Sequence, residues 1–128
     1  LNVTPVGLDE LLQESDVVTL HLPKNDSTKN ILNKGRLQML KKDAILINLA
    51  RGGLIDEVAL KNILSKNSIA GAALDVFLVE PPIDTDFAHL DNVLITPHIG
   101  GSTEEAILAM GMAAIEGLEN FKDPLKFL

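Results

Sequence analysis

Three residues with side chains suited to acid–base chemistry, Arg51, Glu80 and His98, each follow a short apolar run in the sequence. A guanidinium can hold a carboxylate through two parallel hydrogen bonds, and an imidazole can give or take a proton near neutral pH. A carboxylate beside the imidazole orients the ring and favours its protonated form. This set suits a small carboxylic acid whose neighbouring carbon gains or loses a proton. We expect His98 to be the acid or base, Glu80 to orient it and Arg51 to grip the substrate.

The apolar runs before these residues are typical of parallel strands in an α/β fold. Four runs rich in Val and Ile alternate with patterns of helical spacing. Each is nearly continuous in apolar character, which predicts a sheet covered on both faces. Ligands of an open parallel sheet bind beyond the carboxyl ends of its strands, so one rim should carry all three candidate residues. The runs cover residues 17–20, 44–49, 70–76 and 93–96.

Helical spacing and capping residues predict the elements that cover this sheet. Asn33 and Asp56 each precede a short helical pattern and are expected to cap it. A longer helix is predicted over residues 102–122, beginning at Ser102 with an S-x-x-E capping box. Residues 80–91 show no periodicity and predict an exposed crossover loop.

Each candidate residue also has an ordinary structural interpretation. Arg51 could form an ion pair between loops, Glu80 could be a solvated carboxylate, and His98 could be a hydrogen-bonded loop histidine. Their shared position just after three strands favours the catalytic interpretation. The other two histidines, His21 and His89, show no metal-ligand spacing with His98, so no metal site is predicted.

The composition narrows the classes of function. The 128 residues fit one domain, and 46% hydrophobic with 23% charged residues predict a chain that folds. A net charge of −7 and the absence of Trp and Tyr argue against nucleic-acid binding. The absence of Cys excludes disulfides and favours a cytoplasmic location. No apolar run approaches the roughly 20 residues of a membrane span, so no membrane partner is expected.

Four stretches of the sequence carry a family resemblance. Their order and spacing resemble the nicotinamide-binding domain of D-isomer-specific 2-hydroxy acid dehydrogenases, nearest to the phosphoglycerate dehydrogenase branch. The resemblance implies the second half of a doubly wound, Rossmann-type parallel sheet, in truncated form. The stretches are ESDVVTLHLP (14–23), ILINLARGGLIDEVAL (45–60), IAGAALDVFLVEPP (69–82) and NVLITPHIGGSTEEA (92–106).

The resemblance also implies a cofactor, a reaction and roles for particular residues. The cofactor is NAD, and hydride passes between the nicotinamide and C2 of a small 2-hydroxy or 2-oxo acid, with 3-phosphoglycerate among the candidates. Arg51, Glu80 and His98 match the catalytic residues of the family. The implied cofactor contacts come from Leu22, Leu49, Ala50, Arg51, Asp75, His98, Ile99, Gly100 and Gly101.

The sequence departs from the family pattern in ways that predict a partial domain. It has no G-x-G-x-x-G motif and no acidic residue at the end of an earlier strand to bind the adenosine ribose, and it lacks the substrate domain. Since it also begins with Leu1 instead of Met, we expect a piece or a processed product. Residues 1–128 would be the C-terminal half of the dinucleotide-binding domain, with helix 102–122 leading back to the substrate domain.

Two expectations follow for the isolated chain. Without the pyrophosphate-binding motif it should bind NAD poorly and turn over inefficiently. The strand at residues 17–20 would be an unpaired apolar edge. We expect self-association through this edge, or through the faces that the missing helices would cover, which favours a homo-oligomer.

Two other functions stay open. Corepressors related to this family keep the same three residues, yet act as NAD(H)-sensing scaffolds that recruit partners. A truncated remnant that is inactive and only dimerises is the third hypothesis. The residues that precede Leu1 in the parent sequence would discriminate between an enzyme and a remnant, and an assay of the parent protein would separate an enzyme from a scaffold.

Overall fold

The structure is a computed structural model that describes residues 3–82 and 86–119. These residues fall into two compact units that divide after His98. The first unit holds a parallel sheet with its helices, and the second holds one long helix. In chain order the elements are α1 (Leu8–Glu14), β1 (Val17–Leu20), α2 (Lys34–Leu37), β2 (Ile45–Asn48), α3 (Glu57–Ser65), β3 (Gly71–Leu74), the 3-10 helix η1 (Asp86–His89), β4 (Val93–Ile95) and α4 (Glu104–Glu119).

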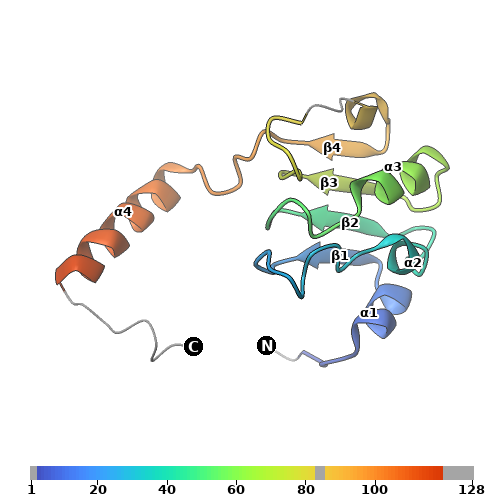
Figure 1. Ribbon diagram of the computed structural model, residues 1–128, viewed down its shortest axis with the longest axis horizontal. Helices are drawn as coiled ribbons and strands as arrows, with labels where there is room; N and C mark the ends of the chain where they lie inside the picture. Colours follow the sequence, from blue (N-terminus) through green and yellow to red (C-terminus); the bar gives the residue numbers. More distant parts are fainter. Residues whose placement is uncertain (1–2, 83–85, 120–128) are drawn as a thin grey trace. The chain divides into compact units, whose positions relative to one another are not determined.

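The four strands form one parallel sheet in the order β1-β2-β3-β4, as Figure 1 shows. Each strand therefore pairs with the next strand along the chain. The pairing holds Ile45 opposite Val17, and Val93 opposite Ala72. Because all strands run the same way, their carboxyl ends share one rim. The sequence prediction of a parallel α/β sheet is confirmed, and every predicted run contains its strand.

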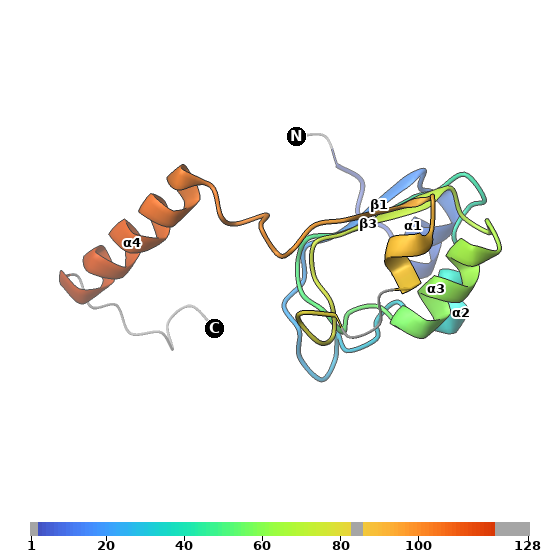
Figure 2. The same cartoon turned by 90° about the horizontal axis from the view of Figure 1, so that it is seen from above.

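The two faces of this sheet differ in the first unit. Helices α1, α2 and α3 all lie on one face (Figure 2). Inward residues such as Leu46 are fully buried, whereas Ile45 and Leu94 keep 43% and 64% of their surface exposed. The predicted cover on both faces is therefore wrong within this unit. A continuous apolar run puts apolar groups on both sides of a strand, but it does not show how many layers of helix lie against them.

Capping residues begin the two short helices α2 and α3 as predicted. The Asn33 side chain accepts a hydrogen bond from the Arg36 backbone N–H at 3.1 Å. The Asp56 carboxylate accepts one from the Ala59 backbone N–H at 3.0 Å. Both bonds satisfy N–H groups that have no partner inside the helix. The Asp56 cap fixes where α3 starts, next to the rim of the sheet.

The crossover from β3 to β4 is more ordered than the sequence predicts. Residues 86–89 form η1, and Phe87 is buried at 3% exposure. Its ring packs on Phe77 with the ring centroids 5.9 Å apart. The prediction of an exposed loop is wrong for this part of the segment. A single aromatic side chain anchors the turn by burial, and one residue produces no periodic signal.

The second unit begins its helix one residue later than the capping box predicts. The Thr103 hydroxyl accepts a hydrogen bond from the Ala106 backbone N–H at 3.1 Å, and α4 starts at Glu104. The Ser102 prediction is wrong because two adjacent residues can both act as caps, and backbone geometry selects the second one. The predicted end of the helix near residue 122 lies outside the described residues.

Candidate active site

The three turns after β2, β3 and β4 carry the candidate catalytic residues. Arg51 follows β2, Glu80 follows β3 and His98 follows β4. These strands are neighbours in a parallel sheet, so the turns emerge side by side on the carboxyl rim. This rim is where ligands of open α/β sheets bind.

Glu80 and His98 form a direct pair. Glu80 Oε2 lies 2.6 Å from His98 Nδ1, and Glu80 Oε1 accepts a hydrogen bond from the Phe77 backbone N–H at 2.9 Å. These two bonds, the one to His98 first, hold the pKa of the Glu80 carboxyl below its ordinary value of 4.5. Both side chains keep solvent contact, with 35% of Glu80 and 49% of His98 exposed. The pair is thus preset and still open to a ligand.

A hollow of about 340 Å³ lies beside this pair, within the range of small-molecule sites. Asp75 forms part of its wall and is 2% exposed. The Thr96 hydroxyl donates a hydrogen bond to Asp75 Oδ1, so this buried carboxylate has a partner. Much of the remaining wall is apolar, with Phe77, Pro81 and Ile95 among its residues. Such a hollow suits a flat ring with one polar edge.

Arg51 stands apart from the pair. Its Nη1 donates to the Ala50 carbonyl at 2.7 Å, and the residue is exposed. It lines a second hollow on the rim together with His21, Leu22 and Lys24. Among the described contacts, none joins the Arg51 side chain to Glu80 or His98. The structure therefore brings Glu80 and His98 together. Arg51 lies on the neighbouring turn, after β2, without a described contact to either residue.

The turn that presents Arg51 is shaped by a buried amide. Asn48 is 2% exposed, and its Nδ2 donates to the Arg51 carbonyl at 3.0 Å. Its Oδ1 accepts from the Ala50 backbone N–H at 3.1 Å. Sequence analysis did not select Asn48. The signal was a polar residue at the end of an apolar run, where an unpaired amide would be costly.

The turns after β2 and β3 touch through their backbones. A Cβ atom at Gly52 would lie 1.8 Å from the Phe77 carbonyl oxygen and 2.7 Å from the Leu78 nitrogen. Only glycine allows this approach without a shift of the backbone. The same segment after β3 is also bound from α3, because Glu57 Oε1 accepts from the Leu78 N–H at 2.6 Å. No sequence pattern pairs Glu57 with a residue 21 positions away.

The other residues implied as cofactor contacts differ in placement. Leu22 and Leu49 are exposed on the rim, at 37% and 51%. Ile99, Gly100 and Gly101 belong to the unit after His98. Their contacts with a cofactor remain a prediction.

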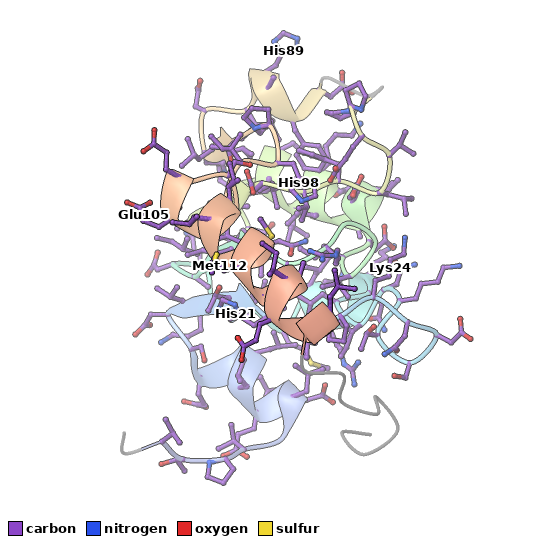
Figure 3. All side chains as sticks on the ribbon, turned by 90° about the vertical axis from the view of Figure 1, so that its left-hand side faces the viewer. His21, Lys24, His89, His98, Glu105 and Met112 are labelled. Atoms are coloured by element: carbon purple, nitrogen blue, oxygen red, sulfur yellow. The ribbon has the colours of Figure 1, made fainter. Side chains whose placement is uncertain are left out.

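His98 has a positive φ of 55°, in the left-handed region of the backbone. His89 points outward from η1, away from His98 (Figure 3). His21 Nε2 lies 3.1 Å from the Thr19 hydroxyl.

Within residues 3–82 and 86–119, no group of three or more His, Asp or Glu side chains is placed to hold a metal ion. No helix in that part of the chain is long and apolar enough to cross a bilayer.

A four-stranded parallel sheet with its titratable side chains on the carboxyl rim defines a nucleotide-binding α/β domain of the Rossmann type. Residues 1–100 match the family model of the D-isomer specific 2-hydroxyacid dehydrogenase, NAD binding domain. The chain belongs to this family, and NAD is the cofactor class of the domain.

Known proteins support this assignment. The chain is 46% identical to the D-3-phosphoglycerate dehydrogenase of Methanocaldococcus jannaschii over 112 residues, which are 88% of this chain and 21% of that protein. It matches an acyclic imino acid reductase (Bsp5) in complex with NADPH and D-Arg, with a TM-score of 0.85, 38% identity, and 91% and 37% of the two chains covered. It also matches the D-lactate dehydrogenase with NAD+ from Lactobacillus jensenii, with a TM-score of 0.80 and 35% identity. That match covers 87% of this chain and 38% of the other. The chain thus spans well under half of each of these relatives.

Proposed function

We propose that this chain forms the proton-transfer side of the active site in an NAD-dependent dehydrogenase of D-2-hydroxy acids. The observation that carries the proposal is the Glu80–His98 pair on the carboxyl rim. When bound, the nicotinamide accepts or supplies the hydride at C2 of the substrate. The chain's own residues must then move the hydroxyl proton and hold the acid.

His98 is the proton carrier in this proposal. Its Nδ1 is held by Glu80, and its Nε2 has no hydrogen bond among the described contacts. A carboxylate that accepts from Nδ1–H leaves Nε2 as the basic nitrogen of the neutral ring. Nε2 then takes the hydroxyl proton in the oxidation and returns it in the reduction. Glu80 holds the ring through Nδ1 in both directions of the reaction.

Arg51 binds the substrate carboxylate. Its guanidinium is exposed and has one described partner, a neighbouring carbonyl. It can therefore meet a carboxylate through two parallel hydrogen bonds at little cost. The turn braced by Asn48 sets the direction of this group.

The residues around the rim fit the cofactor. The hollow beside the pair offers apolar walls for a ring and the buried Asp75 carboxylate for an amide N–H. Leu22, Leu49 and Ala50 supply apolar contacts on the neighbouring turns, and Ile99, Gly100 and Gly101 continue the chain from His98. Lys24 supplies positive charge for phosphate oxygens in the second hollow, which it lines together with Arg51.

The phosphoglycerate dehydrogenases among the relatives make 3-phosphoglycerate the first substrate to test.

The protein would act in the cytoplasm. It would form a homo-oligomer. In the isolated 128 residues, the β1 edge is one surface for self-association. We expect sedimentation of the 128-residue chain at micromolar concentration to give more than the monomer mass, and a clean monomer would contradict this part.

The catalytic proposal is tested by turnover in the protein that carries this chain. The assay offers NAD or NADP with both enantiomers of several 2-hydroxy acids, including 3-phosphoglycerate. The D enantiomers should react, and His98→Ala should lower kcat by about 10²- to 10⁴-fold, the usual contribution of a general acid or base. His89→Ala, on the outward surface of η1, is the matched control and should keep full activity. A His98→Ala protein that retains most of its rate would refute the assignment.

The isolated 128 residues should show little turnover. The chain contains no G-x-G-x-x-G motif to bind a pyrophosphate. Titration with NAD should give much weaker binding than in the protein that carries the chain. Equal binding and equal rates in both would contradict this expectation.

A further inference from the structure

The segment that carries Glu80 has no regular secondary structure, yet its backbone N–H groups are bound by two carboxylates. The Phe77 N–H donates to Glu80 Oε1 at 2.9 Å, inside the segment. The next N–H, from Leu78, donates to Glu57 Oε1 at 2.6 Å. Glu57 lies on α3, so this second bond ties the segment to a helix that packs on the sheet.

The position of Glu57 is not explained by helix capping. The Asp56 carboxylate already caps α3 through the Ala59 N–H. An acidic residue in the first turn interacts favourably with the helix dipole wherever its side chain points. The Glu57 carboxylate instead reaches across to a backbone N–H of another loop. The bond is therefore a specific link between α3 and residues 77–80.

The turn after β2 also lies against this segment. The Gly52 backbone lies against the Phe77 carbonyl so closely that no Cβ fits between them. The peptide between Phe77 and Leu78 is thus contacted both by the Gly52 backbone and by the Glu57 carboxylate. If the Glu57 bond is lost, the contact with Gly52 alone does not fix the segment. That contact stops the segment from moving closer to the turn after β2, but it does not stop the segment from moving away.

We propose that Glu57 is a positioning residue, which holds residues 77–80 on the rim so that Glu80 keeps its hydrogen bond to His98. The inference rests on the proposed function only in treating the Glu80–His98 pair as catalytic. Glu57 touches neither residue of the pair in the described contacts, and it acts through the backbone of Leu78.

The test separates the reach of the Glu57 side chain from its charge. Glu57→Asp keeps the charge and the favourable first turn, but it is one methylene too short to reach the Leu78 N–H. Glu57→Gln removes the charge and keeps an acceptor oxygen at the same reach. Glu10→Asp is the matched control, since Glu10 is an exposed first-turn glutamate on α1.

Two readouts in the full chain do not depend on catalysis. One is the pH titration of the Glu80 carboxyl followed by carbon NMR, and the other is hydrogen exchange of the Leu78 amide. For Glu57→Asp, the Glu80 carboxyl should titrate at higher pH than in the unchanged chain. Exchange at Leu78 should accelerate by about fivefold or more, as expected for one lost hydrogen bond. Glu57→Gln keeps a weaker, neutral hydrogen bond at the same reach, so both changes should be smaller than in Glu57→Asp. Glu10→Asp should change neither.

The outcomes decide the proposal independently of the enzyme assay. A folded Glu57→Asp chain with unchanged Glu80 titration and unchanged Leu78 exchange would overturn it. Equal effects of Glu57→Asp and Glu57→Gln would also overturn it, because charge would then be the cause. In the protein that carries the chain, Glu57→Asp should lower kcat several-fold with little change in the KM for NAD. If the titration moves as expected while His98→Ala keeps its turnover, the positioning role stands and the proposed function fails.

Discussion

The rim of the sheet carries two charged sites that differ in how firmly the protein holds them. The Glu80–His98 pair is bound on several sides, by its own hydrogen bond, by the Phe77 N–H and, one step away, by Glu57. Arg51 is exposed, and its guanidinium has one described partner. The chain therefore fixes the group that would move a proton and leaves free the group that would meet a ligand.

This difference fits the demands of the two tasks. A proton carrier works best when its ring nitrogen and charge are set before substrate arrives. A charged group that binds substrate gains most when it does not first have to break a strong internal contact. The predictions that follow probe each site, in order of decreasing effect, in the protein that carries this chain unless stated otherwise.

After His98→Ala, replacement of the exposed Arg51 should have the largest effect. Arg51→Ala should lower kcat/KM by about 10²- to 10³-fold, because it removes charge-assisted hydrogen bonds worth about 1.5–3 kcal/mol each. Arg51→Lys should recover only part of this loss, since an ammonium does not match both carboxylate oxygens. Steady-state kinetics with the best substrate measures both. A lysine variant with full activity would show that Arg51 acts only as a charge.

Removal of the charge from the fixed pair should have a smaller effect. Glu80→Gln keeps the size of the side chain, but it removes the carboxylate charge that lies 2.6 Å from His98 Nδ1. The rate should fall by about ten- to a hundredfold, in the range seen when a group that orients a functional histidine is lost. The pH profile of kcat/KM is the measurement. An unchanged profile would mean that the pair has no role in setting the proton carrier.

A methyl group between the two turns should perturb both sites together. Gly52→Ala places a Cβ 1.8 Å from the Phe77 carbonyl oxygen, so the turns must separate. Overpacking of this kind costs about 1–3 kcal/mol of unfolding free energy. Urea unfolding of the 128-residue chain should show this loss, with Gly101→Ala as the control because a Cβ there has nothing within 4 Å. Equal stability of the two variants would contradict the close approach.

Acid should release the fixed pair with a small loss of stability. The pKa of Glu80 is lowered in the folded chain, so its stabilising contribution is present above its ordinary value of 4.5. The contribution is lost as the pH falls through the folded-state pKa, which lies below 4.5. The difference in unfolding free energy between the unchanged chain and Glu80→Gln should therefore shrink below that pH. Because both side chains are partly exposed to solvent, this difference in unfolding free energy should be about 1 kcal/mol or less.

Local patterns were sufficient to predict much of the fold. The four apolar runs located the strands, and the caps Asn33 and Asp56 located two helix starts. These features depend on residues close together in the chain. The convergence of Glu80 and His98 was also predictable, because neighbouring parallel strands bring their carboxyl ends to one rim.

Features that depend on distant residues were not predictable from the sequence. The burial of Phe87 depends on Phe77, and the binding of Leu78 depends on Glu57, 21 residues away. The separation of Arg51 from the pair depends on the turn that Asn48 braces. Each of these is decided by tertiary packing, for which one sequence carries no periodic or spacing signal.

The left-handed backbone at His98 has a consequence for inherited variation. Asn and Gly accept a φ of 55° at least as readily as His. We therefore expect a change of His98 to Asn to leave the fold intact while removing the proposed proton carrier. If the proposed role holds, surveys that rank natural variants by cellular protein level would score such an allele as benign, and an assay of turnover would be needed to detect it.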